Sequence, residues 1–128
     1  MAAIRISQDQ EDAFRQAAEA DFNRRVLLHV RRDLAEPAAL LSDEEILRRL
    51  RDCAPRAAKH GLVTEKQLIC YLDASILLGA GFDQSGEHPW VLTLLGSTKL
   101  SPPDKANLLL ATACSIYSGR KDAACSKK

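Results

Sequence analysis

Helix-start signals recur along this chain, and they constrain its fold more than any other feature. Ser7, Ser42, Thr64 and Ser101 each precede a stretch in which apolar residues recur at helical spacing. After Ser42 and Thr64, a Glu or a Gln follows at the third position, which is the reciprocal pattern of a capping box. No stretch shows the period-two alternation of a half-buried strand. The sequence therefore predicts an all-α protein.

The stop signals divide the chain into about five helices. Proline and glycine end most of them, because proline pushes its predecessor out of the helical region and glycine tolerates a left-handed cap. The expected helices run from Ser7 to Pro37, Ser42 to Gly61, Thr64 to Gly79, Pro89 to Gly96 and Ser101 to Gly119. Pro55 lies inside the second stretch and should kink or divide it. We expect a single bundle domain over residues 1–119 and a disordered polar tail over residues 120–128.

Two of these helices carry clear burial patterns. The first has an unbroken i, i+4 apolar series and should be long and amphipathic, with the members Phe14, Ala18, Phe22, Val26, Val30 and Leu34. The third is apolar over most of its circumference, with Leu72 and Ile76 near its middle. A helix that is apolar all round is a buried one. The third helix is therefore expected to be the central helix of the bundle.

Charge and targeting signals indicate a cytoplasmic protein. The formal net charge of +1 gives no general attraction to nucleic acid or to an anionic membrane. Arginines do cluster on the first two helices, but acidic residues interleave with them and stacking aromatics are scarce, so no nucleic-acid partner is expected. No run of apolar residues is long enough to span a membrane. The first residues lack the apolar core of a secretory signal.

The sequence contains no recognisable catalytic, metal-binding or disulfide motif. The cysteines match neither zinc spacing nor a small disulfide framework, so Cys53, Cys70 and Cys114 are interpreted as core residues and Cys125 as a free thiol. Cys70 lies on the most apolar helix, where burial should raise the pKa of its thiol. The three histidines are far apart. We therefore expect no catalytic residue, no metal and no cofactor.

The segment between the third and fourth helices is the most informative for binding. One polar loop contains Asp83, Glu87 and His88, whose side chains are ordinary ligands for a cation. Their spacing matches no known metal-binding loop, so we favour a solvated loop without a metal. Trp90 follows Pro89 and has two interpretations: an indole that plugs the top of the bundle, or an interface anchor of the kind enriched at binding hot spots. The predicted partner-binding residues are Gln84, Glu87, His88 and Trp90.

The same segment carries a resemblance to a known group of proteins. Phe82-Asp83, a polar loop, Pro89-Trp90 and Leu100-Ser101-Pro102-Pro103-x-Lys105 follow one another in order, and the chain opens with Ile4-Arg5-Ile6-Ser7. This arrangement resembles small helical proteins encoded in bacterial type VI secretion effector loci, over most of residues 4–117. The loop departs from the group by an additional Ser85-Gly86-Glu87.

The resemblance implies an accessory role without catalytic residues. An adaptor or chaperone would hold a secreted effector or spike protein from the same locus for loading. An immunity protein that occludes the active site of a cognate toxin is the alternative. An enzyme is the third class, and it would need a cleft with perturbed ionisable groups, which the sequence does not indicate.

Overall fold

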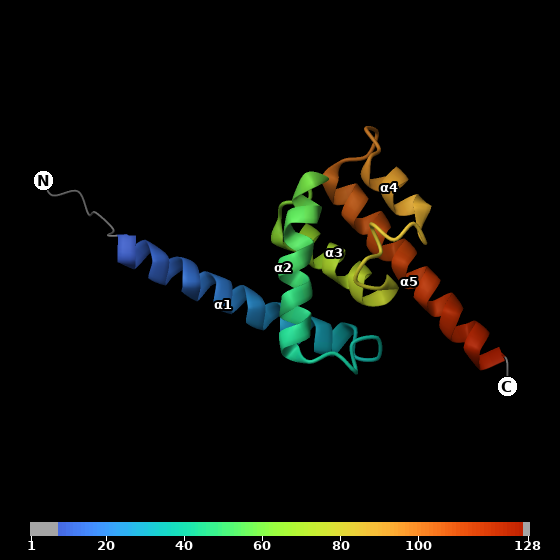
Figure 1. Cartoon of the computed structure of the whole chain (residues 1–128), viewed down its shortest axis with the longest axis horizontal. Helices are drawn as coiled ribbons and strands as arrows, with labels where there is room; N and C mark the ends of the chain where they lie inside the picture. The colour runs from blue at the N-terminus through green and yellow to red at the C-terminus, as the bar shows by residue number, and fades with distance from the viewer. Residues whose placement is uncertain (1–7, 127–128) are drawn as a thin grey trace, which may run out of the picture.

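Helices account for the regular structure of residues 8–126, the part of the chain that the structure describes. The computed structural model describes residues 8–126, with side chains from residue 12 to residue 120. That part of the chain contains no strand and folds into five helices: α1 (Gln8–Asp33), α2 (Asp43–Lys59), α3 (Glu65–Leu78), α4 (Pro89–Leu95) and α5 (Pro102–Ser126). Figure 1 shows α2 to α5 gathered around one centre, with α1 entering from the side. The prediction of an all-α bundle of about five helices is confirmed.

The predicted capping residues form the starts of α2 and α3. The Thr64 hydroxyl accepts a hydrogen bond from the Gln67 N–H at 3.1 Å, and the Gln67 side-chain oxygen accepts one from the Thr64 N–H at 3.3 Å. The Ser42 hydroxyl accepts from the Glu45 N–H at 3.1 Å. These bonds satisfy backbone donors that have no partner within the helix, so both boundaries are fixed by local chemistry.

A Schellman motif ends α2 at the expected glycine. Gly61 has φ +80° and donates its N–H to the Ala58 carbonyl, and the Leu62 N–H donates to the Ala57 carbonyl, each at 3.0 Å. Only glycine adopts this left-handed conformation without steric cost. Leu62 is buried, and its apolar contact completes the motif.

α3 is the central helix, as its composition predicts. Every residue from Cys70 to Leu78 is buried, and α3 packs most extensively against α5 and α2. Its last turn has no basic residue of its own. Two arginines of α2 donate to carbonyls at and just beyond this end: Arg49 bonds to the Ser75 carbonyl at 2.8 Å, and Arg56 bonds to the Ala80 carbonyl at 3.2 Å. These bonds fix α2 to the C-terminal end of α3.

Only the second half of α1 belongs to the core. Val26, Val30 and Leu34 are buried, Phe22 is partly buried, and Phe14 is 67% exposed. The expectation of one core-facing series was therefore wrong for its first members. Each i, i+4 step advances about 40° around a helix, so the first and last members of the series are separated by about 200° and cannot face one partner. Figure 1 shows the N-terminal half of α1 extending away from the other helices.

The predicted division of α2 at Pro55 and the predicted end of α5 at Gly119 do not occur. α2 is continuous through Pro55, which lies on an exposed face, where water can satisfy the carbonyl that loses its donor. α5 is continuous through Gly119 to Ser126, so the predicted tail begins inside a helix. Gly119 is not among the glycines with positive φ, and a helical glycine costs only about 1 kcal/mol relative to alanine. Glycine ends a helix where it takes the left-handed cap, as Gly61 does.

Candidate functional site

A buried polar cluster anchors the loop between α3 and α4. The Tyr71 hydroxyl donates to Asp83 Oδ2 at 2.5 Å, and Arg56 Nε forms an ion pair with the same oxygen at 3.3 Å. Phe82 packs beside Tyr71 with ring centroids 5.1 Å apart. Burial and the bond to Asp83 raise the pKa of the Tyr71 phenol. The interpretation of Asp83 as part of a solvated loop was therefore wrong, because this carboxylate links the loop to α2 and α3.

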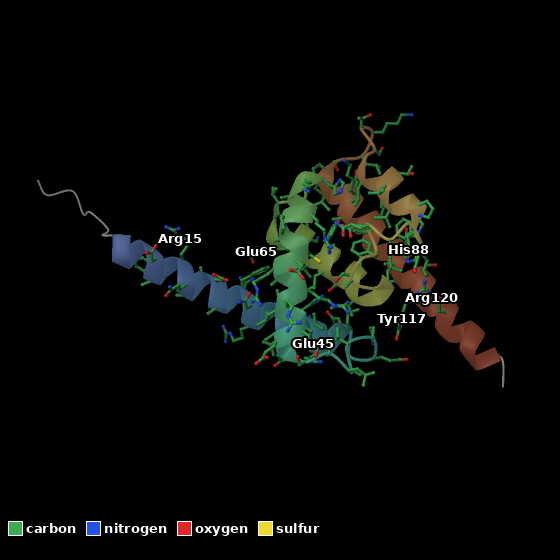
Figure 2. The ribbon with its side chains drawn as sticks, viewed as in Figure 1. Arg15, Glu45, Glu65, His88, Tyr117 and Arg120 are labelled. Carbon is green, nitrogen blue, oxygen red and sulfur yellow. The ribbon has the colours of Figure 1, made fainter. Side chains whose placement is uncertain are left out.

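The remainder of the loop is exposed until His88. Gln84 and Glu87 are exposed, and Ser85 accepts the Glu87 N–H at 3.3 Å, a local bond of the kind expected for a solvated turn. His88 is buried and stands edge-on to Trp90, with ring centroids 6.2 Å apart. Figure 2 labels His88 beside α4 and α5. The loop thus reaches α4 through a buried imidazole that contacts the indole.

α4 presents two neighbouring apolar faces. Val91 and Leu95 are buried in the core, whereas Trp90 and Leu94 are only partly buried beside it. Pro89 occupies the first turn, where its missing N–H costs nothing, and this fixes the direction in which the short helix begins. Trp90 is consequently neither a fully buried plug nor a free surface residue.

Trp90 lines an open groove between α4 and α5. The groove has a volume of about 570 Å³ and is lined by Trp90, Thr93, Leu94, Ser97, Leu100, Leu108 and Thr112. None of these side chains is charged, and three hydroxyls are the only side-chain hydrogen-bonding groups besides the indole N–H. Leu108 is 44% exposed, although it neighbours the fully buried Leu109. An apolar groove with a few polar groups has the character of a binding site.

The structure brings together only part of the predicted site. Trp90 lies in the groove, whereas Gln84 and Glu87 are exposed on the loop and His88 supports the indole from outside the lining. The groove residues of α5 were missed. A sequence signal for them existed: Leu108 and Thr112 form an i, i+4 pair beside the buried row of Ala106, Leu109 and Ala113. That pattern marks a second face on α5, but it does not reveal that α4 packs against that face.

A second polar contact joins α1 to α3. His29 Nε2 lies 2.8 Å from Asp73 Oδ2, and His29 Nδ1 lies 3.0 Å from Asp33 Oδ2. Burial raises the pKa of Asp73 to about 6, although the contact with His29 opposes that shift. Both ring nitrogens of His29 thus face carboxylates, which leaves neither nitrogen directed at a nucleophile.

The cysteines divide into buried and exposed groups. Cys53 and Cys70 are buried and free, and desolvation raises the pKa of both thiols, as predicted for Cys70. Cys114 is exposed, so its assignment to the core was wrong. It lies on α5 and lines the cavity beside the α1–α2 connection, together with Leu77 of α3. The side chain of Cys125 lies outside the described residues.

The described side chains form no metal-binding cluster: no three His, Cys, Asp or Glu side chains within residues 12–120 converge on a point that could hold a metal ion. Among the described helices, none combines the length and the apolar character needed to cross a bilayer. Comparison of the chain with protein-family models, with curated proteins and with solved structures finds no match.

Proposed function

We propose that this chain is a non-catalytic protein-binding module that holds its partner in the groove between α4 and α5. The observation that carries the proposal is the partly buried Trp90 in an open, uncharged groove of about 570 Å³. Trp is enriched among residues that dominate binding energy, especially where neighbouring groups exclude water from it. The groove therefore suits an apolar side chain or an amphipathic helix of a partner protein.

Buried and hydrogen-bonded residues support the groove on both sides, which favours binding. His88 contacts the indole from behind, and Asp83 fixes the loop to Tyr71 and Arg56. On the other side, α5 is held against the central α3 through Leu109 and Ala113. A preformed groove loses little conformational entropy when a partner enters it.

The resemblance to type VI secretion accessory proteins supplies the partner class. We infer that the groove holds a secreted effector or spike protein encoded in the same locus, and that the chain acts in the cytoplasm as its adaptor or chaperone. Nucleic acid and membrane are not expected as partners, since the groove offers no positive charge.

A titration of the purified chain with its locus-encoded effector tests the proposal. Leu108→Asp places a charge in the groove and should abolish measurable binding by calorimetry. Leu92→Asp is the matched control, because Leu92 is 56% exposed on α4 but outside the groove lining. Trp90→Ala should weaken binding by about 2 kcal/mol or more. Equal binding by the Leu108→Asp variant and the control would refute the assignment of the groove as the binding site.

The effector's activity separates an adaptor from an immunity protein. An adaptor should leave the activity of the bound effector intact, and deletion of its gene should abolish secretion of that effector. If one equivalent of this chain instead blocks the effector's activity, the immunity function replaces the adaptor function. Hydrolysis of a substrate by this chain alone would contradict the non-catalytic proposal.

A further inference from the structure

His29 joins α1 to α3 by contacting two carboxylates at once. Its Nε2 lies 2.8 Å from Asp73 Oδ2 on α3, and its Nδ1 lies 3.0 Å from Asp33 Oδ2, one turn further along α1. The two carboxylates differ in their surroundings, because the side chain of Asp73 is 3% exposed and that of Asp33 is 47% exposed. We call His29, Asp33 and Asp73 the α1 latch.

The geometry of the latch requires one more proton than a neutral ring supplies. A neutral imidazole carries a single N–H, and an ionised carboxylate carries no donor. With both carboxylates ionised, one nitrogen of a neutral His29 would point its lone pair at a carboxylate oxygen within 3.0 Å. Two acceptors at that distance repel each other. An additional proton, on the ring or on a carboxyl, removes the repulsion, so the observed contacts are those of the protonated latch.

This additional proton belongs to the pair formed by His29 and Asp73. Asp33 accepts bonds from Arg32 at 3.1 and 3.2 Å, and this pairing lowers the pKa of Asp33, which keeps that carboxyl ionised. Burial raises the pKa of Asp73 to about 6. Asp73 Oδ1 is also buried without a hydrogen-bond partner among the described residues, and such a position favours a neutral carboxyl.

The other ionisable groups near the latch do not compensate the charge of Asp73. Four of them border the cavity of about 430 Å³ between α1 and α3, namely Arg25, Glu65, Lys66 and Cys70. Arg25 and Glu65 bond to each other at 3.0 Å, and Lys66 is exposed. Burial raises the pKa of the Cys70 thiol, and likewise that of Cys114 on α5, so both stay neutral. α2 places no side chain on this cavity. Among the described residues, His29 is thus the only cationic group that contacts Asp73.

The latch lies between a fixed end of α1 and an end that the bundle leaves free. At the C-terminal end, Arg31 bonds to Asp43 at 2.8 Å and to the Leu41 carbonyl at 2.6 Å, which ties the last turn of α1 to the start of α2. Towards the N-terminus, the side chains of residues 12–21 are exposed, and Figure 1 shows this half of α1 extending away from the other helices. The latch therefore acts where α1 leaves the bundle.

We propose that α1 docks onto α3 with the uptake of one proton, which His29 and Asp73 share, so that acid holds the helix firmly and a rising pH loosens it. The docked pKa of Asp73 lies above its ordinary value of 3.8, so the stabilisation is complete below that value and is lost as the pH rises through about 6. One proton linked in this way shifts the docking equilibrium by roughly tenfold between pH 5 and pH 7. The latch is independent of the proposed function, because none of its residues lines the groove between α4 and α5.

The rate at which Cys70 reacts with a pyridyl disulfide tests the latch. Cys70 is buried beside the cavity between α1 and α3, so its thiol should become accessible when α1 moves away. After correction with the rate for an unfolded peptide of the same local sequence, the labelling of Cys70 should increase roughly tenfold from pH 5 to pH 7. Mass spectrometry identifies the labelled cysteine. Cys53, which is buried elsewhere in the core, should react more slowly than Cys70 at both pH values.

Variants of the latch should lose this pH dependence. Asp73→Asn cannot take up the proton, and His29→Gln removes the ring, so the corrected rate should become independent of pH in both. His29→Gln decides the question if Asp73→Asn does not fold, because His29 is partly exposed. His60→Gln is the matched control: it removes a histidine that lies outside the latch, at the end of α2, and it should keep the tenfold change. Leu108→Asp, in the groove, should also keep it, which separates the latch from the proposed function.

Three results would overturn the latch. The first is a corrected rate for wild-type Cys70 that is the same at pH 5 and pH 7. The second is a pH dependence that persists undiminished in His29→Gln. The third is equal labelling of Cys70 and Cys53, which would show that α1 does not open separately from the rest of the core.

Discussion

α3 and the N-terminal half of α1 (residues 8–20, called the α1 arm) are both helices with apolar residues, and they have opposite surroundings. Nine consecutive residues of α3, Cys70 to Leu78, are buried, whereas every described side chain of the arm is exposed. α3 is apolar around most of its circumference, so it is covered in any packing that forms a core. On the arm, the apolar residues form a narrow stripe whose direction rotates around the helix axis from one turn to the next. Apolar spacing therefore predicts that a segment is helical more securely than it predicts what covers that helix.

The largest expected effect comes from truncating the core of α3. Leu72 is fully buried, so Leu72→Ala should lower the free energy of unfolding by about 2–5 kcal/mol. Leu92→Ala removes the same atoms from a side chain that is 56% exposed and should change stability by less than about 0.5 kcal/mol. Denaturant unfolding measures both. Equal effects would mean that α3 is not the centre of the core.

The second-largest effect on stability is expected from removing Asp83, which anchors the loop between α3 and α4. Asp83→Ala leaves the Tyr71 hydroxyl and Arg56 without their shared acceptor, and this should cost about 1–3 kcal/mol. Gln84→Ala, at the exposed neighbouring position, serves as the control. The effects of Tyr71→Phe and Asp83→Ala should be strongly non-additive, because the two residues share one bond. Additive effects in chemical denaturation would show that the Tyr71–Asp83 bond does not contribute.

The buried carboxyl of Asp73 on α3 should give a pH dependence of opposite sign to that of most carboxylates. The pKa of Asp73 is raised to about 6 from 3.8, so the folded state binds the proton more strongly than the unfolded state does. Its contribution to stability therefore increases as the pH falls, by about 1 kcal/mol between pH 7 and pH 5. Asp73→Asn should remove this dependence. If the difference in unfolding free energy between wild type and variant is constant over that range, the burial of Asp73 is wrongly assigned.

The smallest effect is expected on the arm. Phe14→Ala should change the unfolding free energy by less than about 0.5 kcal/mol, whereas Val26→Ala, on the same helix, should cost more because Val26 is buried. Thermal melts at low protein concentration compare the two. A large loss for Phe14→Ala would place that ring against the bundle.

The sequence predicts the fold well because the boundaries are set locally. Thr64 with Gln67, and Gly61 with its two carbonyl partners, act within one or two turns of chain. Pro55 does not divide α2 and Gly119 does not end α5, because their effects depend on whether their face is solvated and on which φ they adopt. Long-range context decides such cases.

The candidate site was less predictable because it depends on packing between distant segments. Trp90 was predicted as a binding residue and lies in the groove, but Leu100 and Leu108 acquire that role only when α5 packs beside α4. Asp83 was misread because its partners, Tyr71 and Arg56, are on other helices. No local rule states which buried tyrosine a loop carboxylate will meet.

The central claim is that the partner binds an exposed surface, the groove between α4 and α5, and not the buried core. Hydrogen exchange with and without the locus-encoded effector tests this claim most directly. The amides of α4 and of residues 104–112 should exchange more slowly in the complex, while those of α3 should be slow and unchanged in both states. Protection confined to residues 84–87, or the absence of any change over α4 and α5, would contradict the assignment of the groove as the binding surface.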